Sequence, residues 1–170
     1  MTTLVLTVVG DDRAGLVAAV AQIIDAHGGN WERSQLAELA GAFAGIVEVS
    51  VAPDHADALR AALTEIEGLV TVAIPGHETA VDAASARRFS FQVLGNDHPG
   101  IVREISMALS GRGVSIERMT SETRDAAMAG GRLFEATIAA VVPASVAVGD
   151  LTAEVERIGA ELQVDVTLLD

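Results

Sequence analysis

Gly10-Asp11-Asp12-Arg13-Ala14-Gly15-Leu16-Val17 returns later in the chain as Gly95-Asn96-Asp97-His98-Pro99-Gly100-Ile101-Val102, with both glycines displaced by 85 residues. The displacement is kept downstream, where residues 27–33 match residues 112–118 and both segments end in Glu-Arg. Self-similarity at a fixed offset marks the unit of folding. We therefore expect two copies of one small domain within the 170 residues.

Each copy has a hydrophobic pattern typical of six elements in the order strand, helix, strand, strand, helix, strand. In the first copy, branched residues over 4–9 predict a strand that ends at Gly10, and apolar residues at helical spacing over 16–24 predict a helix that stops at 27–29. The remaining elements are expected at 30–39 (strand), 43–51 (strand), 58–66 (helix, with Asp54 as its cap) and 69–74 (strand).

The second copy repeats this order, with strands over 89–94, 114–123, 133–142 and 164–169 and helices over 99–111 and 148–162. Aligning Phe43 with Phe134 keeps one face of the third strand apolar and raises the offset to 91, which predicts six additional residues in the hairpin around 124–131. The order is that of the split βαβ, or ferredoxin-like, unit. The predicted fold is α+β, with two ferredoxin-like βαββαβ domains in tandem (1–74 and 89–170, linker 75–88) and antiparallel sheets that carry helices on one face.

Composition points to a cytoplasmic protein. No apolar run approaches the ~18 residues that a membrane-spanning helix needs, and no basic region precedes the first short apolar strand. The chain has no cysteine, so neither a disulfide nor a thiolate metal site can form, which is compatible with a reducing compartment. A domain of this size buries only about 60% of its unfolded surface, so we expect packing against the other copy or a second chain, and a homodimer.

The charge argues against nucleic acid as a partner. The net charge is −13, with 3 arginines against 10 acids in residues 1–76 and 6 against 12 in residues 89–170. Nucleic-acid affinity comes largely from Lys and Arg contacts to phosphate, and this chain has no lysine and no arginine cluster beyond Arg87-Arg88. Direct binding of DNA or RNA is therefore not expected.

The turn between the two repeated glycines is the candidate binding position in each copy. It joins a strand to a helix, where free N–H groups and the helix dipole favour a carboxylate. In the second copy, Asp97 or Asn96 is expected to cap the helix over 99–111, and Pro99 to occupy its first turn. Gly100 is expected to let a ligand approach closely. The first copy has alanine in place of this proline and is expected to be less rigid. A well-capped junction without a ligand is the alternative interpretation.

The sequence gives little support for a nucleotide, metal or catalytic site. The Gly-x-x-x-x-Gly spacing lacks the Lys-Ser/Thr of a phosphate loop. No two histidines have the spacing of a zinc motif, so no metal site is expected. His98 lies within the turn, where it either meets a ligand or is a surface histidine. No nucleophile with a base and no cofactor motif is evident, so the sequence predicts no enzyme, no catalytic residue and no cofactor.

Glu32-Arg33 recurs as Glu117-Arg118 on predicted strands, where neighbouring side chains point to opposite faces. Either these residues form a salt bridge at the rim of a domain or dimer interface, or they belong to a solvated face. Trp31, the only tryptophan, is expected in the core or at an interface.

The two glycine-bracketed turns, followed by Gly113-Val114-Ser115-Ile116-Glu117, closely resemble tandem ACT domains, and over the whole chain the sequence resembles the glycine cleavage system transcriptional repressor family. The resemblance implies a non-enzymatic regulatory protein that binds a small amino acid, such as glycine, at domain interfaces. It also implies control of transcription through contact with a DNA-binding regulator protein. The ligand-binding residues that it implies are Asn96, Asp97, Gly100, Ile101 and Ser115 in the second copy and Asp11, Asp12, Gly15, Leu16 and Asn30 in the first.

One other function stays open at the sequence level. A ligand-free pair of ACT-like domains would hold partner proteins through its sheet edges or helices, and the repeated glycines would then serve only the turns.

Overall fold

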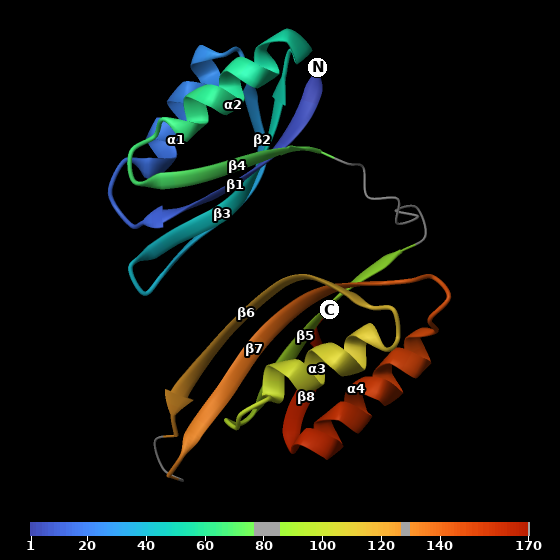
Figure 1. Ribbon diagram of the computed structural model, residues 1–170. Coiled ribbons are helices and arrows are strands. Elements are labelled where there is room, and N and C mark those ends of the chain that lie inside the picture. The colour runs from blue at the N-terminus through green and yellow to red at the C-terminus, as the bar shows by residue number, and fades with distance from the viewer. Residues whose placement is uncertain (77–85, 127–129, 170) are drawn as a thin grey trace. The chain divides into compact units, whose positions relative to one another are not determined.

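The computed structural model describes residues 1–76, 86–126 and 130–169, and the chain divides into two compact units, Met1–Thr79 and Ala80–Asp170. Each unit is one βαββαβ domain with a four-stranded antiparallel sheet. Figure 1 shows the two helices of each unit on one face of its sheet. The predicted α+β class, element order and antiparallel sheets are confirmed. Within the described residues, no helix is long and apolar enough to span a membrane.

Unit 1 contains four strands, two α-helices and one turn of 3₁₀ helix. The elements are β1 (Thr2–Asp11), α1 (Leu16–Ala26), β2 (Asn30–Leu39), β3 (Ala42–Val51), η1 (Pro53–His55), α2 (Ala56–Thr64) and β4 (Leu69–Pro75). The strand order in the sheet is β2-β3-β1-β4, so the two central strands are the ones that the chain visits first and third.

Unit 2 repeats this arrangement with the order β6-β7-β5-β8. Its elements are β5 (Arg87–Asn96), α3 (Ile101–Ser110), β6 (Ser115–Asp125), β7 (Arg132–Val142), α4 (Val148–Leu162) and β8 (Val164–Leu169). Gly10 pairs with Phe43 and Gly95 pairs with Phe134, which confirms the offset of 91 in the third strand. Residues 127–129 of the longer hairpin lie outside the described residues.

Alternation along the strands places the core between sheet and helices. In β1, Leu4, Leu6 and Val8 are at most 1% exposed, whereas the residues between them face the other side. The helices contribute side chains at a spacing of three to four residues, which forms one apolar stripe per helix. The buried helix residues of unit 1 are Leu16, Val20 and Ile24 from α1 and Ala56, Leu59 and Leu63 from α2.

The helix starts differ from those expected, and strands extend into the expected linker 75–88 at both of its ends. No side chain caps α2, because Asp54 lies in η1 and the residue before the helix is His55. β4 extends through Pro75 and β5 begins at Arg87, so the outer residues of the predicted linker are strand residues. The centre of that linker, residues 77–85, lies outside the described residues.

Candidate functional site

The two repeated turns have the same backbone shape. Gly15 precedes α1 with φ 92° and ψ −4°, and Gly100 precedes α3 with φ 95° and ψ −5°. This left-handed conformation favours glycine because other residues carry a Cβ that clashes there. Ala14 and Pro99 therefore lead into equivalent helix starts, and the proline does not give the second turn a different conformation at its glycine.

The first glycine of each motif is required by strand packing. A Cβ at Gly10 would lie 2.3 Å from the carbonyl oxygen of Gly68, and one at Gly95 would lie 2.4 Å from Cγ1 of Val164. Both contacts are far below van der Waals distance. The two glycines of the motif thus have different roles, one in sheet packing and one in opening the helix.

Each turn is fastened to the hairpin beside it. The N–H of Asp12 donates to the carbonyl of Gly41 and the N–H of Asp97 donates to that of Arg132, both at 2.8 Å. Leu16 and Ile101, the first helical residues, are 3% and 4% exposed and belong to the two cores. Their side chains anchor the helices, so these two residues can offer a ligand only their main chain.

The expected caps are wrong. Neither α1 nor α3 has a side-chain cap, and Pro99 stands before the capping glycine, so it is not in the first helical turn. The first N–H groups of a helix have no carbonyl within the helix to bond, and they lie at the positive end of the helix dipole. In α3 the first of them, that of Ile101, donates to the carbonyl of His98 at 3.4 Å. The carboxylates of Asp11 and Asp12 are exposed beside the first turn, and that of Asp97 lies 3.9 Å from the guanidinium of Arg132.

A hollow of about 490 Å³ adjoins the turn of unit 1. Its lining combines three predicted residues with five that the sequence did not single out: Asp12, Gly15 and Leu16, and then Arg13, Val17, Ala18, Ala21 and Phe43. Arg13 donates a hydrogen bond to the carbonyl of Glu67, which brings a cation to the mouth of the turn. Arg13 is the only basic residue in the first motif, and this was the signal that could have identified it.

The turn of unit 2 carries histidine where unit 1 has this arginine. Nδ1 of His98 lies 3.3 Å from the carbonyl oxygen of Pro99, and the ring is partly exposed. The second turn therefore carries an imidazole side chain where the first carries a guanidinium. The predicted Asn96 is the exposed last residue of β5 and pairs with Leu133.

The structure does not bring the second-strand residues to the turn of their own unit. Asn30 pairs with Ser50, whereas Asp11, next to the turn, pairs with Ala42 at the other end of β3. Eight residue steps at roughly 3.3 Å give about 26 Å along the strand. Ser115 is separated from the turn of unit 2 in the same way, because it pairs with Val141 while Asn96 pairs with Leu133.

The repeated Glu-Arg dipeptides mark β-bulges. The register of β2 shifts between Trp31 and Arg33, and that of β6 shifts between Ile116 and Arg118, so the glutamate is the additional residue in each. Glu32 accepts hydrogen bonds from Ser50 and Asn30. Both lower the pKa of its carboxyl, and the bond from Ser50 has the larger effect. Asn30 is thus engaged in the sheet edge.

Arg33 pairs with Glu48 on the adjacent strand, with Nε donating to Oε2 at 2.8 Å. Arg88 pairs with Glu117 at 3.2 Å in the second unit. Trp31 packs against the core of unit 1, as expected. Among residues 1–76, 86–126 and 130–169, no three His, Cys, Asp or Glu side chains gather as ligands for a metal ion.

These features define a class, a tandem of two ferredoxin-like domains. Residues 2–69, which lie in unit 1, match the model of the ACT domain family, and unit 2 repeats the fold of unit 1. The expected resemblance to tandem ACT domains is confirmed. No curated protein matches the chain.

Among the solved structures that match along nearly the whole chain are the following two. A protein of unknown function from Galdieria sulphuraria is 27% identical, with 98% of this chain and 96% of that chain covered and a TM-score of 0.84. A proposed glycine cleavage system transcriptional repressor is 19% identical, with 99% and 96% covered and a TM-score of 0.74. At the second identity, the likeness is one of fold.

Proposed function

We propose that this chain is a non-enzymatic regulatory protein that binds a small amino acid, glycine or one similar to it, at its strand-to-helix turns. The observation that carries the proposal is the pair of uncapped helix N-termini, each opened by a left-handed glycine and flanked by a carboxylate. The ACT fold of unit 1 supports it, since this fold is that of a regulatory module.

The turn offers complementary groups for both charged ends of an amino acid. The α-carboxylate would accept hydrogen bonds from the N–H groups of the first helical turn, with Arg13 beside it in unit 1. The ammonium would face Asp12 or Asp11, and in unit 2 Asp97 with the amide oxygen of Asn96. The apolar wall of the first hollow favours an amino acid whose side chain is not charged.

The proposed ligand-binding residues fall into two groups. The turns contribute Asp11, Asp12, Gly15, Leu16, Asn96, Asp97, Gly100 and Ile101. Asn30 and Ser115 lie about 26 Å from the turn of their own unit. They would meet a ligand only where a second chain brings its own turn against them.

Regulation would pass through protein contact. The chain is acidic and has no lysine, which fits a protein that contacts a DNA-binding partner and does not bind DNA itself. We propose a cytoplasmic homodimer that contacts a DNA-binding regulator and so controls genes of amino-acid or glycine-cleavage metabolism.

Isothermal titration with glycine, serine and the other amino acids tests the binding step. Asp12→Asn and Asp97→Asn remove a charge but keep the shape, and each should abolish the heat of amino-acid binding at the turn of its own unit. The matched Asp25→Asn on the exposed side of α1 should leave the heat of binding unchanged. Absence of heat with every amino acid would contradict the proposal. Retention of full affinity by the double variant would move the site away from the turns.

A second candidate is a ligand-free module that holds partner proteins. Val70, Val72 and Ile74 of β4 are 64%, 54% and 50% exposed, and they favour this function because exposed apolar area marks contact surfaces. A partner whose affinity for the chain is the same with and without amino acids would support this function.

A further inference from the structure

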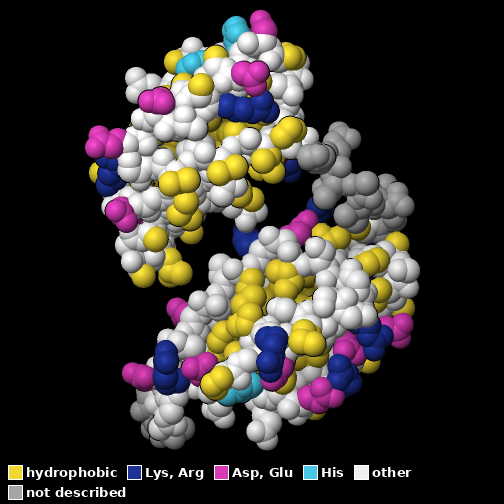
Figure 2. Space-filling model, in the orientation of Figure 1, with side chains coloured by type: hydrophobic (Ala, Val, Ile, Leu, Met, Phe, Trp, Pro, Cys, Tyr) yellow, Lys and Arg dark blue, Asp and Glu magenta, His cyan; other side chains and the backbone are white. Residues whose placement is uncertain are grey.

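A surface groove of about 510 Å³ lies between the two helices of unit 2. Its floor is apolar, because Ile158 belongs to the core of the unit and Ala108 and Leu162 pack, partly buried, against that core. The lining residues of each helix recur at a spacing of three or four, which places them on one helix face. Figure 2 shows hydrophobic and charged side chains next to one another over this part of unit 2.

An exposed methionine extends the apolar floor to the surface. Met107 lines the groove and is 66% exposed. The fold does not require it, because the glycines that open α1 and α3 are 85 residues apart and the same offset places the exposed Gln22 of α1 at this position. Methionine is flexible and polarizable and is common on surfaces that adapt to a partner. An apolar side chain beside an apolar floor therefore indicates a contact surface.

A buried carboxylate lies beneath the charged side of this groove. Gly10 pairs with Leu69 and Gly95 pairs with Val164, so the second helices of the two units correspond at an offset of 95. The same offset places Glu154, which is 5% exposed, where unit 1 has the fully buried Leu59. A buried ion pair is often no more stabilising than an apolar residue in its place. The stability of the fold therefore does not explain this glutamate.

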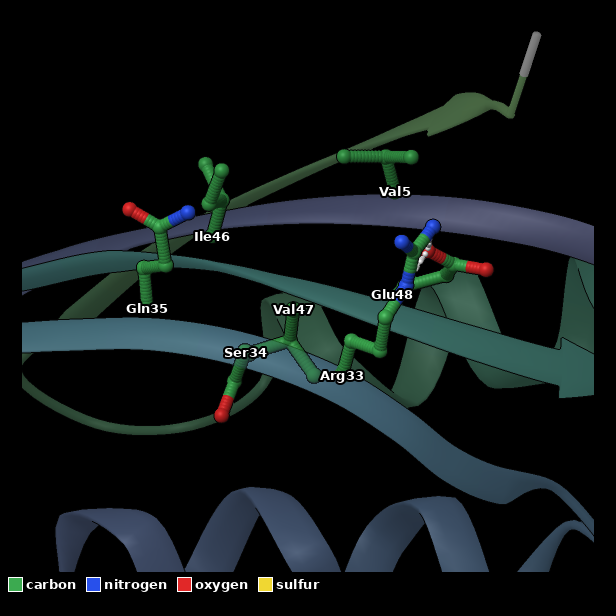
Figure 3. Close-up of a pocket in the computed structure, with 7 residues that line it drawn as sticks. All are labelled: Val5, Arg33, Ser34, Gln35, Ile46, Val47 and Glu48. Atoms are coloured by element: carbon green, nitrogen blue, oxygen red, sulfur yellow. Dashed lines mark hydrogen bonds and ion pairs between the residues drawn. The ribbon is translucent and has the colours of Figure 1, made fainter. Parts of the chain in front are cut away.

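Glu154 fixes the orientation of the arginine that lines the groove. The Nε of Arg157 donates to Oε2 of Glu154 at 3.2 Å, its Nη2 donates to Oε1, and its Nη1 donates to Glu161. Arg112 donates to the same Glu154 at 2.8 Å. The Arg33–Glu48 pair of unit 1 differs, because it stands on the sheet with its arginine 81% exposed (Figure 3). All three nitrogens of the groove arginine are thus engaged by carboxylates.

Charge indicates which partner fits the groove. Its lining carries two carboxylates, Glu104 on α3 and Glu161 on α4, and the guanidinium of Arg157 is already neutralised by its own bonds. Glu104 lies 3.5 Å from the exposed Arg103, and an exposed pair of this kind is weak. What the rim offers to a partner is carboxylate oxygen, so the complement is a lysine or arginine side chain that donates.

The chain itself does not supply this complement. It has no lysine, α1 contains no arginine, and each of the other three α-helices contains one. A second copy would also bring an equally acidic surface, with a net charge of −13. The occupant must therefore be a different protein. A helix suits the groove, because a third helix packs its side chains between those of two neighbours as ridges into grooves.

We infer that the groove between α3 and α4 receives an amphipathic helix of a partner protein, with apolar residues on one face and lysine or arginine on its flanks. The inference rests on the protein partner of the proposed function and supplies the surface for it. It does not depend on amino-acid binding, so the experiments below contain no amino acid and their outcome is independent of the titration with amino acids.

Fluorescence anisotropy with two labelled peptides tests the groove. Both are amphipathic helices of about 18 residues, or five turns, with leucine on one face and either lysine or glutamate on the flanks. The full chain should bind the lysine peptide at least about 10-fold more tightly than the glutamate peptide. Met107→Gln, which gives α3 the residue of α1, should weaken binding of the lysine peptide about 10-fold, whereas Gln22→Ala in unit 1 should leave it unchanged. Circular dichroism checks folding.

Charge and position are tested with the same lysine peptide. Glu104→Gln should weaken binding and reduce its salt dependence more than Glu156→Gln, a matched change on α4 outside the groove lining. Amide shifts on addition of the peptide should concentrate at residues 104–108 and 157–162.

Three results would overturn the inference. The first is equal affinity for the two peptides or none for either. The second is full affinity of Met107→Gln for the lysine peptide. The third is a wild-type dimer that Met107→Gln dissociates, because the groove would then belong to a second copy of the chain.

Discussion

Replacing Gly10 by alanine is expected to destabilise unit 1 by about 1–2 kcal/mol. The added Cβ would lie 2.3 Å from the carbonyl oxygen of Gly68, and an ordinary contact begins at 3.4 Å, so strand β1 and the turn before β4 must separate by about an ångström. The obstacle is backbone and cannot rotate away. Overpacking of this kind costs about 1–3 kcal/mol, and the lower entropy of the unfolded chain offsets about 0.4–1 kcal/mol.

The assay can be confined to unit 1. Trp31 is the only tryptophan in the sequence and packs against the core of this unit, so its fluorescence reports unfolding of unit 1. For a unit of this size the expected loss corresponds to a melting midpoint lower by about 4–15 °C. Gly149→Ala in α4 of unit 2 is the control for the same substitution without a clash, since no atom lies within 4 Å of its added Cβ, and its stability is followed by circular dichroism because Trp31 reports only on unit 1.

An unchanged midpoint for Gly10→Ala would refute the assignment of this glycine to strand packing. The repeated first glycine would then need another explanation, such as the close approach of a ligand. A lowered midpoint with normal amino-acid binding at low temperature is the result that we expect.

Three further outcomes follow from the same structure. Gly15→Ala should lower the stability of unit 1 by about 1 kcal/mol in urea unfolding, because its φ of 92° is left-handed although the space beside it is open, and Gly15→Asn should cost less. Glu154 is 5% exposed and accepts hydrogen bonds from Arg112 at 2.8 Å and from Arg157. Glu154→Gln should therefore lower the free energy of unfolding of unit 2 by about 1.5–3 kcal/mol. The pKa of Glu154 is lowered from 4.5, chiefly by the hydrogen bond from Arg157. The stabilisation is therefore present above about pH 4.5 and is lost as the pH falls through the lower pKa of the folded state. The difference in free energy of unfolding between wild type and Glu154→Gln should narrow in that pH range. A double-mutant cycle on the exposed Arg33 and Glu48 should give a coupling of only about 0.2–1 kcal/mol that declines with salt, and a larger, salt-independent value would contradict it.

The fold was predictable because its signals are local and occur twice. Strand alternation, helical spacing and the Phe43–Phe134 alignment gave the element order and the register of the central strands. The caps were wrong because Asp97 and Pro99 look like capping residues in sequence, yet the left-handed Gly100 occupies that position. The bulges at Glu32 and Glu117 were missed, since an extra residue on an edge strand leaves no mark in polar alternation.

The candidate site was predictable only in part. Periodicity located both turns, but it could not show that Asn30 and Ser115 lie at the far end of the sheet, because that follows from strand pairing. Phe43 reaches the first hollow from β3, which is distant in sequence from the turn. The groove between α3 and α4 depends on how two helices pack, which no single helix reveals.

The central claim is that an amino acid binds at the turns, and amide chemical shifts measured during titration of ¹⁵N-labelled chain with glycine and other small amino acids test it most directly. We predict saturable shifts concentrated at residues 11–18 and 96–103, including the N–H groups that open α1 and α3. Spectra that stay unchanged at those residues with every amino acid, or shifts confined to other parts of the chain, would contradict the account.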